Sequence, residues 1–293
     1  MKVQLFLLLF SLFVSACTDQ KTSSGTEQPS EQISALSTEV EQEGKVDEKP
    51  IEQVEALEEE DADRQPVTPD ELDLPRLDEG SGVNILPVGL FHEDEVQPDA
   101  DQKEWVGLFQ KGDSTYLKRV QVNLSRENDP ILDEEGQKTG WYVSVENEED
   151  CILLISGVEL SKGEVPSLEF SKKSPVPGDT LTFTFGSKQM NIYVTGTKEK
   201  VSDDWYEVEN YKMIVASEVN EKTIEQTIVA KANFEDAIIT MLWAGDLDGD
   251  NQMDFIIDTS RHYNMSVPTL FLSSGAKEGN LVECVAKHVS VGC

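Results

Sequence analysis

The chain has 293 residues, of which 57 are Asp or Glu and 24 are Lys or Arg, for a formal net charge of -33. Such an excess of acid argues against nucleic acid as a partner and against electrostatic docking onto anionic lipid, because both require Lys and Arg. The length is sufficient for one large domain or two small ones.

Residues 1–16 have the composition of a secretory signal peptide. Lys2 precedes an apolar run from Leu5 to Val14, and the small residues Ser15 and Ala16 follow. The run is too short to span a hydrocarbon layer of ~30 Å as a helix. We therefore expect a targeting signal that is cleaved off, and not a transmembrane anchor.

Val-Ser-Ala-Cys at residues 14–17 is similar to the lipobox of bacterial lipoproteins. The resemblance implies that Cys17 is the first mature residue and carries two or three acyl chains, palmitate among them, which anchor stably where one does not. It places the protein in the bacterial cell envelope. Thr18 stands where Asp is associated with inner-membrane retention, which favours the outer membrane. An ordinary signal peptide with an incidental Cys is the alternative.

Residues 17–82 form a polar, acidic stretch without aromatic side chains. From residue 18 to 82 there are 20 Asp and Glu and 5 Lys and Arg. Without large apolar side chains, such a stretch cannot offset the entropy that is lost on ordering. We expect a disordered acidic tether between the lipid and a folded domain. A cation sponge is the competing interpretation.

Residues 83–293 have the composition of a folded, β-rich domain, and all four Trp residues lie there. Short apolar runs predict buried strands near 152–155, 238–243, 255–257 and 270–272. Elsewhere apolar residues alternate with polar ones, which is typical of half-buried strands. The alternating sets are Val120, Val122 and Leu124; Trp141, Val143 and Val145; Leu181, Phe183 and Phe185; Ile192 and Val194; Tyr211, Met213 and Val215.

These patterns predict an all-β fold of about a dozen short strands, arranged as an antiparallel sandwich or barrel-like domain. No stretch of twelve or more residues shows an amphipathic helix. No repeat with the length of a propeller blade is visible. A split into two smaller β units near Asn220 is the alternative to a single domain.

Three cysteines remain besides Cys17, and an odd number leaves one thiol unpaired. Export permits disulfides. Cys284 alternates with apolar residues, which favours a buried, inert thiol. A bridge between Cys151 and Cys293 would tie down the end of the chain and close the longer loop. We take Cys151 and Cys293 as the candidate disulfide, while the other connectivities stay open.

Residues 245–258 contain the one pattern that points to a specific chemistry. Carboxylates fall at alternate positions, at Asp246, Asp248 and Asp250, and again at Asp254. Ca²⁺ takes six to eight oxygen ligands at about 2.3–2.6 Å, and alternate residues of a tightly wound loop can converge on one ion. Gln252 would add its backbone carbonyl. The sequence therefore predicts a calcium site; a solvated acidic loop is the alternative.

The loop resembles the calcium loops of FG-GAP repeats in integrin-type propellers and, more loosely, those of dockerins. The resemblance covers about a dozen residues, implies calcium ligation by these carboxylates with Gln252, and fixes no overall fold. Gly249 and Asn251 fall where the chain must bend, and both tolerate left-handed backbone angles. Asn251 stands where the families commonly have Gly, and the loop occurs once. Ile257 replaces the distal Glu of an EF-hand, which disfavours that motif.

Weaker signals come from the histidines. Asp258, His262 and Ser266 are the residue types of a hydrolytic triad, but a triad is a spatial arrangement and no Gly-x-Ser-x-Gly elbow is present. We interpret His92, in an acidic segment, as part of a solvated turn, and His288 as a surface residue. Scattered histidines without a Cys-x-x-Cys motif give zinc little support.

Two classes of function stay open. The favoured class is a non-enzymatic binding or structural module, with calcium pinning the hairpin, that meets a protein or glycan partner through its Trp residues or sheet edges. The alternative is an envelope hydrolase with a carboxylate-based or calcium-assisted site. Two carboxylates about 5–10 Å apart in a deep cleft would favour the hydrolase, and a shallow surface around the loop would favour the module.

Overall fold

The structure, a computed structural model, describes residues 73–202, 205–219 and 222–292. The predicted signal peptide, Cys17, residues 18–72 of the predicted tether and Cys293 lie outside these ranges. Within them, no helix is both long enough and apolar enough to cross a membrane.

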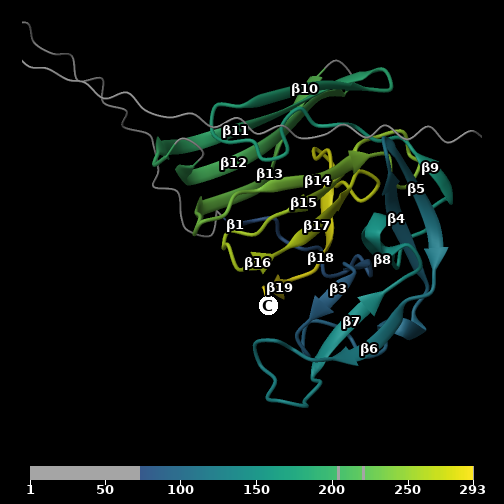
Figure 1. The fold of residues 1–293 in the computed structure, drawn as a ribbon. Helices are drawn as coiled ribbons and strands as arrows, with labels where there is room; N and C mark the ends of the chain where they lie inside the picture. Colours follow the sequence, from purple (N-terminus) through teal and green to yellow (C-terminus); the bar gives the residue numbers. More distant parts are fainter. Residues whose placement is uncertain (1–72, 203–204, 220–221, 293) are drawn as a thin grey trace, which may run out of the picture. The chain divides into compact units, whose positions relative to one another are not determined.

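Nineteen strands and two short 3-10 helices make up the regular structure of the described residues (Figure 1). The strands are β1 (Asp73–Leu74), β2 (Asn84–Leu86), β3 (Gly89–Phe91), β4 (Trp105–Lys111), β5 (Ser114–Val120), β6 (Asn123–Glu127), β7 (Gly140–Ser144), β8 (Cys151–Ser156), β9 (Gly163–Val165), β10 (Thr180–Phe185), β11 (Lys188–Lys200), β12 (Tyr206–Val219), β13 (Lys222–Asn233), β14 (Thr240–Gly245), β15 (Asp254–Asp258), β16 (Met265–Ser266), β17 (Pro268–Leu272), β18 (Glu283–Lys287) and β19 (Ser290–Val291). The 3-10 helices are η2 (Ala100–Gln102) and η3 (Glu148–Asp150).

The strands form four main sheets, which we number 1 to 4. Sheet 1 has the order β1-β13-β12-β11-β10, sheet 2 the order β14-β15-β17-β18, sheet 3 the order β2-β8-β4-β5-β9 and sheet 4 the order β3-β7-β6. Strands β16 and β19 form a separate pair. Neighbouring strands in these sheets are antiparallel. The all-β, antiparallel fold predicted from the sequence is confirmed.

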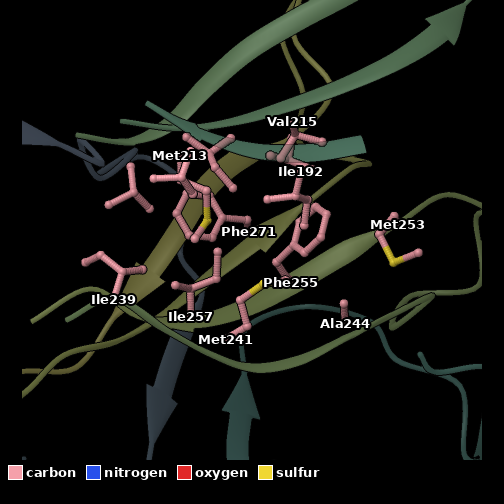
Figure 2. Packing of buried hydrophobic residues seen from close by; sticks show 14 of the residues in the cluster. Ile192, Met213, Val215, Ile239, Met241, Ala244, Met253, Phe255, Ile257 and Phe271 are labelled. Atoms are coloured by element: carbon pink, nitrogen blue, oxygen red, sulfur yellow. The ribbon is translucent and has the colours of Figure 1, made fainter. Parts of the chain in front are cut away.

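Sheet 2 is buried on both faces, which explains its uninterrupted apolar strands. In β15, Phe255 and Ile257 pack in the core that sheet 2 shares with sheet 1, whereas Ile256 packs in the core shared with sheet 3. A strand with both faces covered needs apolar residues at successive positions. Figure 2 shows the first of these cores, where side chains of sheets 1 and 2 meet: Ile192, Met213, Val215, Ile239, Met241, Ala244, Met253, Phe255, Ile257 and Phe271.

Two local predictions are corrected. Val120, Val122 and Leu124 were expected to alternate along one strand, but β5 ends at Val120 in sheet 3 and β6 begins at Asn123 in sheet 4. Val122, 1% exposed, lies between the two strands in a core that joins both sheets. The sequence pattern alone cannot reveal this change of sheet, because the apolar residues stay at every second position from β5 into β6.

The β domain also includes residues 73–82, which were predicted to belong to the tether. Strand β1 pairs with β13 at the edge of sheet 1, and Leu77 packs against the core between sheets 1 and 2. Strands β12 and β13 are antiparallel neighbours in one sheet. The alternative split near Asn220 would therefore divide adjacent strands of sheet 1.

Cys151, at the start of β8, and Cys284, in β18, form no disulfide among the described residues. Burial raises the pKa of each thiol to about 12, so as thiols both are protonated at neutral pH. The buried thiol predicted at Cys284 is confirmed. Because Cys293 lies outside the described residues, the Cys151–Cys293 bridge stays a prediction.

Candidate metal centre

Residues 246–254, which we call the acidic loop, run from the end of β14 to Asp254, the first residue of β15, in sheet 2. Two apolar side chains hold its backbone: Leu247 packs in the core with sheet 3 and Met253 in the core with sheet 1. Both are 2% exposed. Leu247 and Met253 therefore anchor the loop in the cores on the two faces of sheet 2. Its carboxylates lie close together between these two anchors.

Glycine and asparagine shape the backbone of the loop as the sequence predicted. Gly249 has φ +83° and Asn251 has φ +63°, both in the left-handed region. Gly245, just before the loop, is required for a different reason. A Cβ there would lie 2.1 Å from the carbonyl oxygen of Pro166 and 2.6 Å from the ring of Trp243.

Three of the predicted ligand residues converge. Asp246, Asp248 and Asp254 each offer a carboxylate oxygen, and these oxygens all lie within 4.8 Å of one another. Asp246 is 8% exposed and Asp254 is fully buried. This group of carboxylates can hold a metal ion.

Neutral donors bind these carboxylates. The two oxygens of Asp246 accept the backbone N–H groups of Gly249, at 2.8 Å, and Asn251, at 3.0 Å. Asp254 accepts the N–H of Leu247 at 2.7 Å and that of Ser273 at 2.8 Å. These bonds wrap the backbone around the carboxylates but bring no positive charge.

Ser273 and Ser274, in the segment between β17 and β18, belong to the site and were missed by the sequence analysis. The Oγ of Ser273 lies 2.8 Å from Asp254 and 3.0 Å from Asp250. One hydroxyl has one hydrogen, so it donates to only one of these carboxylates at a time. Ser274 donates to Asp248. The only signal in the sequence was a Ser pair directly after a buried strand.

Asp250 and Gln252 lie at the rim of the site. The carboxylate of Asp250 accepts the N–H of Gln252 at 2.7 Å and its side-chain amide at 3.2 Å. The side-chain oxygen of Gln252 accepts a bond from Lys188 at 3.4 Å. Neither residue belongs to the group of converging carboxylates. Their predicted role as ligands stays a prediction.

The electrostatics of the site disfavour an ionised Asp254. Burial raises the pKa of this carboxyl to about 7, and the charge of Asp248 adds to the effect. The hydrogen bonds from Ser273 and Leu247 act in the opposite direction without cancelling the cost of burial. A cation among these oxygens would favour the ionised form, because opposite charge offsets both burial and repulsion.

The triad types after the loop do not assemble. Ser266 donates directly to Asp258 at 3.0 Å, whereas the Nε2 of His262 lies 3.4 Å from Glu235. His92 and His288 were both expected at the surface, and both are buried. His92 contacts Asp129, which is 37 residues away, and His288 packs edge-on against Phe91.

A search of protein-family models, of curated protein sequences and of solved structures finds no significant match to this chain. The metal centre therefore rests on the geometry of the chain's own residues.

Proposed function

We propose that this protein is a lipid-anchored protein of the bacterial envelope whose β domain is a non-enzymatic binding or structural module stabilised by calcium. In this proposal Cys17 carries the lipid, with the outer membrane favoured over the inner. The acidic loop binds Ca²⁺ through Asp246, Asp248 and Asp254, with Asp250 and Gln252 completing the shell. A protein or glycan is the expected partner of the module.

The convergence of three carboxylates, with neutral donors around them, is the observation that carries the proposal. Carboxylate oxygens are hard ligands, and Ca²⁺ accepts six to eight of them in flexible geometry. Zn²⁺ prefers nitrogen and sulfur ligands, which the converging group lacks. Mg²⁺ demands a near-octahedral shell and releases water reluctantly, so it suits a short, irregular loop less well.

Calcium in this loop would connect two parts of sheet 2. Asp254 begins β15, and its hydrogen bonds to Ser273 reach the segment that follows β17. Holding Asp254 ionised would strengthen these bonds, because hydrogen bonds to a charged acceptor are stronger than neutral ones. The metal would thus stabilise the β14–β15 hairpin and its contact with the β17–β18 hairpin, which is a structural role.

The surroundings of the loop support a module more than the alternative hydrolase. The hollow beside it measures about 20 Å³ and is lined by Asn251, Gln252 and Met253, not by the converging carboxylates. A carboxylate-based hydrolase needs a cleft in which a substrate and two carboxyl groups meet. This shallow surface favours a binding or structural module over a hydrolase.

Calorimetric titration of the cation-free full chain with CaCl₂ tests the metal site. We expect saturable binding with a dissociation constant of about 10⁻⁴–10⁻³ M, typical of extracellular calcium modules. The Asp248→Ala/Asp250→Ala variant should give no heat of binding. The matched control is Asp99→Ala/Asp101→Ala, which removes two exposed carboxylates at the same spacing and should bind as the parent does. Unchanged binding by the loop variant would move the site elsewhere.

The lipid anchor has a separate test. Cells producing the full chain are labelled with an alkyne analogue of palmitate and then fractionated. We expect label in the parent and in Cys284→Ser, and neither label nor membrane association in Cys17→Ser. A membrane-bound, unlabelled parent would contradict the lipidation.

A further inference from the structure

A cavity separate from the metal centre lies where sheets 2 and 3 meet. It measures about 210 Å³ and is lined by β2, by residues around η2 and by the end of β18 with His288. Sites for drug-sized ligands measure roughly 300–1,000 Å³. A cavity of this size is therefore matched to a small metabolite.

His288 supplies a buried polar group in the wall of this cavity. The residue is 9% exposed, and the Nε2 atom of its ring has no hydrogen-bond partner among the described residues. Leaving a buried polar atom unpaired costs free energy, so native proteins rarely retain one without a reason. This atom is closed to the cavity as well as to solvent, so His288 forms part of the wall and is not a contact for a ligand.

Two opposite charges line the same cavity without neutralising each other. Glu95 accepts the N–H of Val291 at 2.6 Å and that of His92 at 2.9 Å, and a carboxylate has about four lone-pair sites, so it can accept further bonds. Lys287 is exposed at the cavity. Asp73, which is within reach of the charge of Lys287, forms its ion pair with Lys231 instead.

The remaining wall is apolar. Ile85 and Leu86 of β2 and Trp105 of β4 line it, and the indole N–H of Trp105 is already bonded to the carbonyl of Ala100. Trp105 therefore presents only its apolar surface. One carboxylate, one ammonium and an apolar wall are the complement of a zwitterion with an apolar side chain.

We propose that this cavity binds a free α-amino acid with an apolar side chain. The ammonium of the ligand lies at Glu95, its carboxylate at Lys287 and its side chain against Ile85, Leu86 and Trp105. The proposal is independent of the calcium loop and of the lipid anchor.

Calorimetric titration of the full chain with L-leucine tests the proposal. We expect one saturable site per chain. Isoamylamine is leucine without its carboxylate, and 4-methylpentanoate is leucine without its ammonium group. Each should bind at least about tenfold more weakly, since a charged hydrogen bond contributes a factor of that order. Either compound binding as tightly as leucine would overturn the assignment of the charged ends.

Variants of the two charged residues complete the test. Lys287→Met removes the ammonium and keeps most of the side-chain length. Glu95→Gln removes the charge and retains one of the two oxygens that accept backbone N–H groups. Each should lower the affinity for leucine by about tenfold or more. Lys162→Met, which changes an exposed lysine outside the cavity, should bind as the parent does. Should Glu95→Gln fail to fold, as thermal unfolding would reveal, Lys287→Met alone decides. No heat from leucine, or unchanged affinity in Lys287→Met, would overturn the proposal.

Discussion

Two acidic loops of this protein compensate their buried carboxylates in different ways. In the β6–β7 loop, residues 128–139, the fully buried Asp129 lies 2.5 Å from the Nδ1 of His92. In the acidic loop, Asp254 is equally buried, and among the described residues its hydrogen-bond donors are the neutral groups of Leu247 and Ser273.

The pKa values of these two carboxyls shift in opposite directions. Burial opposes the ionised form of Asp129, yet the hydrogen bond and charge of His92, with two backbone N–H groups, hold the pKa below its usual value. For Asp254 burial prevails and raises the pKa to about 7. Neutral donors alone therefore do not compensate a crowded, buried carboxylate. One loop has its own cationic partner in His92, and in the other the proposed Ca²⁺ would take that place.

The largest expected effect is a pH dependence of the cation-free protein. Because the folded-state pKa of Asp254 lies at about 7 and the ordinary pKa of an Asp carboxyl is 3.8, the native state binds more protons than the unfolded state between these values. Stability should therefore fall as pH rises from about 4 to 7, by up to ~4 kcal/mol from this group. Urea unfolding in a chelator across this range measures it.

Saturating calcium is the control for this pH dependence. A bound cation keeps Asp254 ionised, so the fall should be smaller by the same amount when calcium is present throughout. Equal pH profiles with calcium and with chelator would contradict the role given to Asp254.

The second effect is the stability gained from calcium at pH 7. With a dissociation constant of about 10⁻⁴ M, 10 mM calcium should raise the free energy of unfolding by ~2.7 kcal/mol. Asp248→Asn keeps the shape of the side chain but removes a converging charge, so it should lose most of this gain. Asp129→Asn, in the β6–β7 loop, should lower stability with and without calcium and leave the gain intact. If both variants lost the stabilisation by calcium, the two loops would not differ as described.

A third and smaller effect concerns His92. The hydrogen bond and charge of Asp129 raise its pKa above the ordinary histidine value of 6.5. A raised histidine pKa contributes stability that is fully present below pH 6.5 and lost as pH rises through the folded value. The free energy of unfolding lost in His92→Gln should therefore shrink above pH 6.5. Urea unfolding of the parent and of His92→Gln at pH 6 and pH 9 measures this change. If the difference in free energy of unfolding were the same at both pH values, the charge of His92 would not explain its contribution.

Local features of both regions could be predicted from the sequence. The alternation of Leu181, Phe183 and Phe185 predicts β10, and the left-handed positions at Gly249 and Asn251 follow from their residue types. The convergence of Asp246 and Asp248 also follows, because alternate residues of one tight loop have little freedom to separate. These inferences needed only neighbours in the chain.

Features that depend on register could not be predicted. Ser273 reaches Asp254 because β15 pairs with β17 with Phe255 opposite Phe271, and one sequence without relatives contains no record of that register. The contact of His92 with Asp129 joins residues 37 positions apart. From the sequence alone, a His in an acidic segment looks the same whether it is exposed to solvent or paired with a buried carboxylate. Burial decided between these outcomes, and burial is a property of the whole fold.

The smallest effect separates backbone from charge in the two loops. Gly249, in the acidic loop, has φ +83°, and Gly136, in the β6–β7 loop, has φ +87°. A Cβ added at either glycine would have no heavy atom within 4 Å, so alanine would meet strain in the backbone but no clash. Each substitution to Ala should therefore cost about 1 kcal/mol in cation-free buffer. Urea unfolding of both variants measures the two costs, with the parent as reference. If Gly249→Ala cost several times more than Gly136→Ala, the loops would differ in backbone strain, and charge alone would no longer explain the difference between them.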